Sequence, residues 1–189
     1  LGRRCECMLF PASDQALPDF PRVAGRSVAL VLALPGPRPG LPADLDFTLR
    51  SSLAKRFANR FSAIATFQNG HAGALLGVRA AAVKIEQGAF DACVVAGVES
   101  YLEPETLEWL DTSEQLHGSG ALNNPWGFIP GEGAGAVLLV SGDTVQTSDR
   151  QALGYLLGVG LGIEQHRIRT ETVCIGEGLT AAFREALAA

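Results

Sequence analysis

One stretch decides the fold of this 189-residue chain: Thr66–Ser100, TFQNGHAGALLGVRAAAVKIEQGAFDACVVAGVES. It predicts a turn, an apolar helix and a buried strand in succession. Small and apolar residues occupy almost every side of the helix over positions 72–85, and a helix of that kind is normally buried on several sides. The run Ala92–Gly97 is apolar without interruption, as in a strand covered on both faces of its sheet. We therefore predict that the chain is built around this helix.

His71 stands at the mouth of the predicted helix. The backbone N–H groups of a helix N-terminus create a positive field, so a polar side chain there faces whatever lies above the sheet. A histidine near a helix start also hydrogen-bonds its local backbone in many proteins, so both roles stay open. Glu99 and Ser100 follow the predicted strand at its carboxyl end, where sites gather in α/β sheets. A solvated strand end or a helix cap explains that pair equally well.

The composition excludes several classes of protein. The chain has 15 Lys and Arg against 20 Asp and Glu, a net charge of −5, so the basic footprint of a nucleic-acid-binding protein is missing. It has no run of 18 apolar residues that would predict a membrane span. Four cysteines are too few for a disulfide scaffold and indicate a reduced, cytoplasmic setting. Cys5-Glu-Cys7 could supply two ligands of a metal site, but the sequence shows no second ligand pair. We therefore expect neither a metal nor a cofactor.

The rest of the chain alternates predicted strands and helices. Pro11, Pro18 and Pro21 predict an irregular segment over residues 1–26, which leaves residues 27–189 as a single domain. Strands are predicted at 27–34, 62–67, 136–140 and 152–163, all buried except the second, and helices at 43–61, 104–110 and 179–189. This alternation predicts a layered α/β fold.

Two glycine-rich runs, 131–135 (GEGAG) and 158–162 (GVGLG), raise the possibility of a small nucleotide-binding enzyme. A dinucleotide fingerprint has the spacing GxGxxG, follows a strand and opens a helix. Here the spacing is GxGxG and the first run leads into a predicted strand, so close backbone packing is favoured. His117 and His166 fall in polar loops and are expected at the surface.

Four segments resemble the β-ketoacyl synthases, the condensing enzymes of the thiolase superfamily. One of them, residues 152–162, is similar to the family's strand that follows the GEGAG motif. Residues 126–140, WGFIPGEGAGAVLLV, are similar to that family's DGF-x-x-GEGAG-x-x-x-L strand. Residues 87–100 resemble its Gly-x-x-Asp strand, and residues 176–189 resemble the helix that closes its N-terminal half. The resemblance covers roughly residues 60–189. It implies the N-terminal half of a thiolase-like α/β/α fold, with a mainly parallel mixed sheet around a buried central helix.

The resemblance also implies where the family's nucleophile would stand. In the family, a cysteine at the N-terminus of the central helix takes up the acyl chain, and the helix favours its thiolate. This chain has no cysteine between Ser62 and Ala92. An ungapped count back from Gly88 places His71 at the cysteine position. A register three residues earlier places Gln68 there, which resembles the chain-length factors, catalytically altered partners of ketosynthases. The family's two catalytic histidines belong to its C-terminal half, beyond residue 189.

By this resemblance we expect a divergent β-ketoacyl-acyl-carrier-protein synthase-like protein of fatty acid or polyketide biosynthesis. If active, it would be an acyltransferase of the 3-oxoacyl synthase type, but we expect no cysteine-based condensation. The implied partner is an acyl carrier protein or an acyl thioester. The alternative is a non-catalytic scaffold that holds an acyl carrier or pairs with an active ketosynthase. Because this half alone would expose apolar helix faces, we expect a homo-oligomer, a partner ketosynthase half or a truncated chain.

Overall fold

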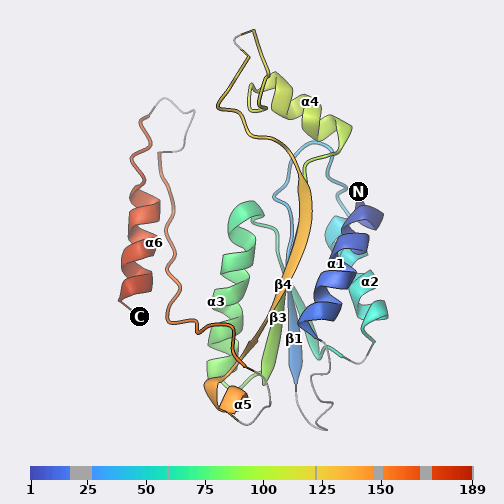
Figure 1. Ribbon diagram of the computed structural model, residues 1–189, viewed down its shortest axis with the longest axis vertical. Helices are drawn as coiled ribbons and strands as arrows, with labels where there is room; N and C mark the ends of the chain where they lie inside the picture. The colour runs from blue at the N-terminus through green and yellow to red at the C-terminus, as the bar shows by residue number, and fades with distance from the viewer. Residues whose placement is uncertain (18–26, 59, 122, 147–150, 167–171, 189) are drawn as a thin grey trace. The chain divides into compact units, whose positions relative to one another are not determined.

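The computed structural model describes residues 1–17, 27–58, 60–121, 123–146, 151–166 and 172–188. The chain divides into two compact units, Leu1–Thr144 and Val145–Ala189. The first unit contains a four-stranded sheet with strand order β2-β1-β3-β4 (Figure 1). Its strands are β1 (Val28–Ala33), β2 (Ala63–Phe67), β3 (Ala92–Ser100) and β4 (Glu132–Val140).

The sheet is mixed and mainly parallel. β1 pairs in parallel with β2 on one side and with β3 on the other, and β3 pairs antiparallel with β4. Every residue of β1 is buried, and β3 is buried from Ala92 to Ala96. These two central strands confirm the buried strands predicted from their uninterrupted apolar sequences, because both of their faces are covered by helices.

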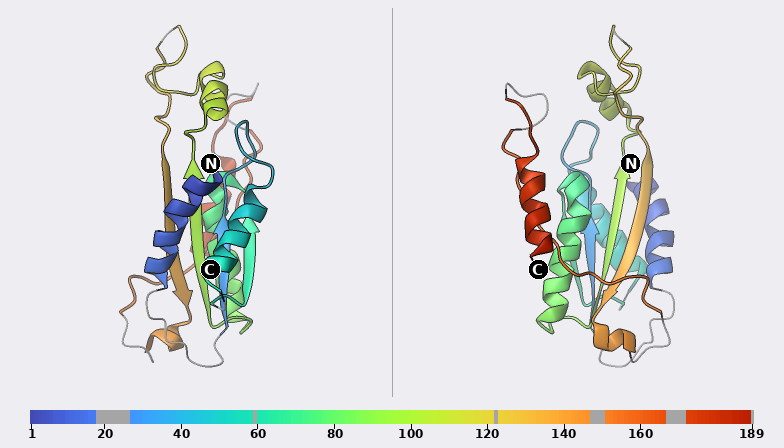
Figure 2. Two further views of the ribbon diagram at one scale, coloured as in Figure 1. Left: turned by 90° about the vertical axis from the view of Figure 1, so that its right-hand side faces the viewer. Right: turned by 60° about the vertical axis from the view of Figure 1, so that its left-hand side comes forward.

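The helices α1 (Gly2–Ala16) and α2 (Leu45–Arg56) cover one face of the sheet, opposite α3 (Gly73–Glu86) (Figure 2). Leu45, Leu49 and Leu53 recur every four residues along α2 and are fully buried. They pack in one apolar cluster with Leu30 of β1 and Val94 of β3. This cluster is the larger part of the core of the first unit.

The first helix corrects a prediction. Residues 2–16 form α1 and are not irregular, while Pro18 and Pro21 lie outside the described residues. Cys5, Leu9 and Ser13 recur every four residues and are buried against the sheet side. Pro11 lies on the exposed side of the helix. The hydrogen bond that a proline removes would have gone to the carbonyl of Cys7, which is also exposed, so water can satisfy that carbonyl and the helix continues.

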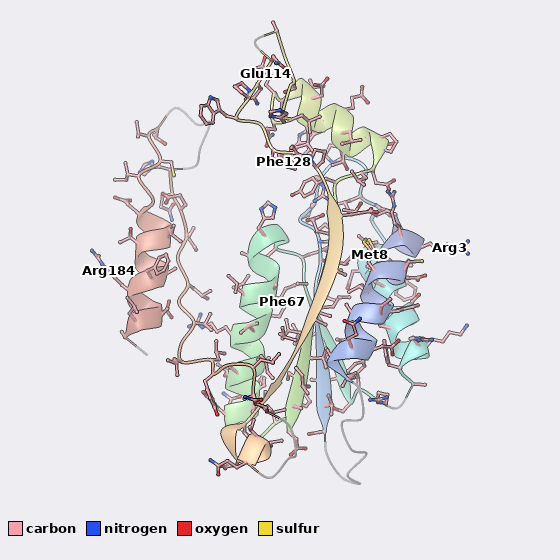
Figure 3. All side chains as sticks on the ribbon, in the orientation of Figure 1. Arg3, Met8, Phe67, Glu114, Phe128 and Arg184 are labelled. Carbon is pink, nitrogen blue, oxygen red and sulfur yellow. The ribbon has the colours of Figure 1, made fainter. Side chains whose placement is uncertain are left out.

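The opposite face of the sheet carries a short 3-10 turn, Gly70–Ala72, and the helix α3 (Gly73–Glu86). The buried residues of α3 are small and recur every four positions: Gly73, Gly77 and Ala81. A Cβ on Gly77 would lie 2.8 Å from Cγ1 of Val31, so only glycine allows this approach of helix to sheet. Phe67, labelled in Figure 3, packs in a second apolar cluster, which lies on this face and includes Val31 and Ala81.

α3 is less buried than its sequence predicts. Leu75 is 64% exposed and Val83 is 41% exposed. The described helix packs on the sheet through one stripe of small residues, so its larger apolar side chains on other sides are left uncovered. Burial on several sides is not seen within the first unit, where the exposed apolar sides of α3 are those expected of this half alone.

Two further boundaries differ from the sequence-based prediction. The helix predicted to reach Phe61 ends at Arg56, because the chain turns at Phe57 and packs that ring edge-on against Phe10 and Phe61. The strand predicted at 136–140 begins earlier, at Glu132, and it is half-exposed. β4 is an edge strand of the described sheet and pairs with β3. Helices therefore do not cover it as fully as they cover the two central strands.

The remaining helices are α4 (Pro104–Thr112), α5 (Gly142–Gln146) and, in the second unit, α6 (Glu177–Leu187). α4 and α6 confirm the helices predicted at 104–110 and 179–189. Among the described residues, no helix has both the length and the apolar character needed to cross a membrane.

The strand predicted at 152–163 is absent from the described part of the second unit. Residues 151–166 carry no strand pairing, and Leu153 and Leu157 are exposed. The segment approaches α6 instead: a Cβ on Gly160 would collide with the carbonyl of Ala182. The N–H of Leu161 donates to the Glu185 carboxylate at 2.7 Å. Close backbone packing therefore explains the 158–162 glycine run, as predicted.

Candidate functional site

A cleft of about 410 Å³ opens at the carboxyl ends of β1 and β3, beside the N-terminal end of α3. Small apolar residues dominate its walls, and His71 and Glu99 are its titratable side chains. The lining residues are Ala33, Leu34, Gly70, His71, Ala74, Gly97, Val98, Glu99, Gly133, Ala134 and Gly135. The cleft is thus a mostly apolar hollow with two polar groups at its walls, a common composition for ligand sites.

A tight turn places His71 at this cleft. Gly70 has φ +53°, in the left-handed region that favours glycine. A Cβ on Gly36 would lie 3.6 Å from the backbone nitrogen of Gly70, so the loop after β1 packs directly against the turn. The 3-10 turn then leads straight into α3. As a result, His71 is exposed and stands at the start of the helix, as its sequence position predicted.

His71 is held by a side chain from β3's end and not by its own turn. Its Nε2 lies 3.1 Å from the hydroxyl oxygen of Tyr101. The Tyr101 ring in turn packs edge-on against Phe128, with 5.1 Å between centroids. Phe128, labelled in Figure 3, lies in the segment that leads into β4. Residues from two other parts of the chain, after β3 and before β4, therefore position this imidazole.

Arg38 connects Tyr101 to Glu99. Its guanidinium lies 4.0 Å from the centre of the Tyr101 ring, a cation–π contact. The same group pairs with the Glu99 carboxylate at 2.5 Å and donates to the carbonyl oxygen of Ser100 at 2.6 Å. The Arg38 side chain is only 6% exposed, so these contacts compensate a nearly buried cation. Removing either partner of the ion pair would leave the other charge partly desolvated.

Burial raises the pKa of Tyr101, and the nearby Glu99 carboxylate raises it further, while Arg38 opposes the shift. Tyr101 therefore keeps its proton at neutral pH and has an O–H group to donate. Neither Arg38 nor Tyr101 was predicted as a site residue from the sequence. The available signals were an isolated arginine in the rigid Pro/Gly loop 35–42 and a tyrosine directly after Glu99 and Ser100.

The glycines 131–135 are not closely packed, which corrects a prediction. A Cβ on Gly131, Gly133 or Gly135 would meet no atom within 4 Å. Gly133 and Gly135 instead line the cleft, and Gly135 pairs with Gly97 of β3. Their missing side chains keep the floor of the cleft open. The pairing of Gly97 with Gly135 depends on the sheet register, so the sequence alone did not indicate it.

The other residues singled out in the sequence lie elsewhere. Gln68 is exposed after β2 and is not among the residues that line the cleft. His117 and His166 are exposed, as predicted. Cys5 is buried and Cys7 exposed, and the described residues contain no cluster able to hold a metal ion.

Within the first unit, Cys5 and Cys93 do not supply a nucleophile to this cleft. Cys93 is buried in β3, and burial raises the pKa of its thiol. Burial also raises the pKa of Cys5 to about 11. Neither residue lines the cleft. A buried thiol with a raised pKa is a poor nucleophile at neutral pH, because the reactive form is the thiolate.

The central part of the chain is similar to a known protein family. Residues 66–145 match the model of the family described as "Beta-ketoacyl synthase, N-terminal domain". This range runs from the end of β2 through α3, β3 and β4, and it includes the residues that line the cleft except Ala33 and Leu34. No curated protein matches the sequence.

Solved structures with the same fold are ketosynthases. One is a type II polyketide synthase acyl-carrier protein in complex with its ketosynthase bound to the hexaketide, with TM-score 0.68 and 17% identity over 96% of this chain and 56% of that one. The ketosynthase from module 6 of the bacillaene synthase of Bacillus subtilis 168 matches with TM-score 0.62 and 17% identity, over 86% of this chain and 30% of that one.

An oxazolomycin ketosynthase domain from Streptomyces albus JA3453 matches with TM-score 0.59 and 18% identity. The match covers 87% of this chain and 38% of that domain. The chain thus spans between 30% and 56% of the length of these structures. The layered fold with its mainly parallel mixed sheet is confirmed as thiolase-like. The predicted resemblance is likewise confirmed: residues 66–145 match the β-ketoacyl synthase N-terminal domain, and the fold is that of ketosynthases.

Proposed function

We propose that this protein is a β-ketoacyl-synthase-like acyl-binding protein of polyketide or fatty acid biosynthesis that forms no cysteine-linked acyl intermediate. The observation that carries the proposal is the side chain at the head of α3. His71, and not a thiol, stands there at the wall of the cleft. The cysteine-based reaction needs a thiolate at that place.

The cleft itself supports binding of an acyl group. Its walls are mostly small and apolar, and Gly133 and Gly135 leave its floor open. An acyl thioester combines an apolar chain with one polar carbonyl, which suits an apolar hollow with few polar groups. A ketosynthase with this fold is known in complex with an acyl-carrier protein, which supports a carrier-bound thioester as the natural ligand.

Intact-mass measurement of the full-length protein tests this proposal. After incubation with butyryl-pantetheine and denaturation, the mass is expected to be unchanged. With the native protein, before any denaturation, isothermal titration calorimetry is expected to detect reversible binding of butyryl-pantetheine. A butyryl adduct that survives denaturation would overturn the absence of covalent chemistry, and absence of binding would overturn the acyl-binding role.

A second candidate role is favoured by a different observation. Leu75 and Val83 leave the outer side of α3 apolar and exposed, as expected of a scaffold that pairs with an active ketosynthase. Leu75→Lys separates the two roles. It should abolish co-purification with a ketosynthase partner if α3 is the pairing surface, while butyryl-pantetheine binding in the cleft is retained.

A further inference from the structure

The contacts around His71 determine which of its ring nitrogens is available to a ligand. Within the described part of the chain, the one side-chain hydrogen bond of His71 is made through Nε2, to the Tyr101 hydroxyl. A neutral imidazole carries one proton, and the partner of one nitrogen fixes the state of the other. The tautomer of His71 therefore depends on which way the proton of Tyr101 points.

Two contacts and the protonation state of Tyr101 favour this residue as the donor in the bond. The Arg38 guanidinium stacks on the face of the ring, and the positive charge there favours donation by the phenol. Phe128 packs edge-on against the same ring and so restricts its orientation. The raised pKa of Tyr101, caused first by burial, keeps the hydroxyl proton in place.

We propose that Tyr101, positioned by Arg38 and Phe128, donates a hydrogen bond from its hydroxyl group to Nε2 of His71 and so fixes the histidine as the neutral Nδ1–H tautomer. The Nδ1–H group then donates a hydrogen bond to the carbonyl oxygen of an acyl thioester bound in the cleft. This last step rests on the proposed acyl-binding function, whereas the tautomer does not. Tyr101 is thus a positioning residue, and His71 is the group that contacts the ligand.

The charge balance at the cleft agrees with a neutral ligand group. Glu99 is one of two titratable side chains on the cleft wall, and its carboxylate is paired with Arg38 at 2.5 Å. This pairing neutralises the carboxylate and removes the attraction that a free Glu99 would have for a cation. A neutral carbonyl that needs one hydrogen-bond donor fits what remains.

The two tyrosines of the chain give a matched pair of variants. Tyr101→Phe removes only the hydroxyl and keeps the ring that contacts Arg38 and Phe128, so the fold is retained. Tyr155→Phe makes the same change at an exposed site in the second unit. Long-range ¹H–¹⁵N correlation spectra of the ¹⁵N-labelled protein at neutral pH show which ring nitrogen carries the proton. His71→Asn identifies the His71 signals.

In the unchanged protein we expect the proton on Nδ1. In Tyr101→Phe we expect a shift of the proton toward Nε2 and a roughly three- to tenfold weaker affinity for butyryl-pantetheine, the effect of one lost hydrogen bond. Tyr155→Phe should change neither property. A proton on Nε2 in the unchanged protein, or the same tautomer in Tyr101→Phe, would overturn the proposal. If the tautomer shifts as expected but no thioester binds to any form, the positioning role stands and the acyl-binding function fails.

Discussion

At the scale of single residues, the site depends on what stands at position 71. Two registers against the ketosynthases were possible from the sequence, one with His71 and one with Gln68 at the family's cysteine position. The structure places His71 in the cleft wall at the head of α3, and it places Gln68 on the exposed chain before the turn. This geometry favours the His71 register, and cysteine substitution can test it directly.

We predict that a cysteine at position 71 is activated by the helix and that one at position 68 is not. A thiol at a helix N-terminus has a lowered pKa, so His71→Cys should be alkylated by iodoacetamide at pH 7 at least about tenfold faster than Gln68→Cys. Peptide mapping by mass spectrometry separates these sites from the exposed Cys7. Faster alkylation at position 68 would favour the other register.

A second residue-scale prediction concerns Cys5 and pH. Burial raises the pKa of this thiol from 9.0 to about 11 in the folded chain. Its contribution to stability is therefore fully present below pH 9 and is lost as the pH rises from 9 to 11, because the unfolded chain releases this proton first. Cys5→Ala should show a shallower loss of melting temperature over that pH range than the unchanged protein.

Cys7→Ala is the control for this measurement, since Cys7 lies on the same helix but is exposed. It should keep the steep loss of the unchanged protein. If the melting temperatures of all three proteins fall by the same amount between pH 8.5 and pH 10.5, the Cys5 thiol has no such role.

At the scale of elements, α3 holds its place because its contact stripe is small. Gly73, Gly77 and Ala81 allow the helix to lie close on β1 and β3, and the head of the helix thereby reaches the carboxyl ends of those strands. β4 contributes in the opposite way. Its glycines have nothing packed over them, so they open the floor of the cleft instead of tightening it.

We predict that Gly77→Val destabilises the protein by about 1–3 kcal/mol, the usual cost of overpacking a core. The added side chain would meet Cγ1 of Val31 and Cγ1 of Val95, which lie 2.8 Å and 3.2 Å from the position of a Cβ. Urea unfolding measures the change. Ala82→Val, a valine on the half-exposed part of the same helix, should cost less than about 1 kcal/mol. Equal losses would show that helix propensity, and not packing, dominates.

At the scale of the whole molecule, the exposed apolar side chains are the main feature. In the first unit, Leu75 is 64% exposed and Trp126 is 93% exposed, and in the second unit Phe183 is 62% exposed. Apolar surface of this extent indicates contact with another chain or segment. A homo-oligomer or a partner ketosynthase half remains our prediction for what covers it.

We predict that the purified protein elutes as a species larger than its monomer mass of 19.8 kDa when size exclusion is combined with light scattering. Leu75→Lys should shift the species toward the monomer, because a charge would then be buried at the contact. Its matched control is Lys84→Arg, which keeps the charge on the same helix. A compact monomer at every concentration would contradict this prediction.

The sequence by itself determined the order of the main elements, the two buried central strands and the resemblance to ketosynthases, because uninterrupted apolar runs and the GEGAG motif are local patterns. It also placed His71 at the start of the central helix. The predictions that were wrong concern elements whose structure depends on contacts with residues distant in the chain. Pro11 is tolerated in α1 because it faces outward, and residues 151–166 form no strand but approach α6 through Gly160 and Gly162.

Only the tertiary structure decided the composition of the site. Arg38, Tyr101 and Phe128 come from three loops that no spacing rule connects, and they meet because β1 and β3 are parallel neighbours while β4 returns beside β3. The same register brings Gly97 opposite Gly135 and opens the cleft. The physical reason is that strand pairing and helix packing are set by burial over the whole unit, and the positions of distant side chains follow from them.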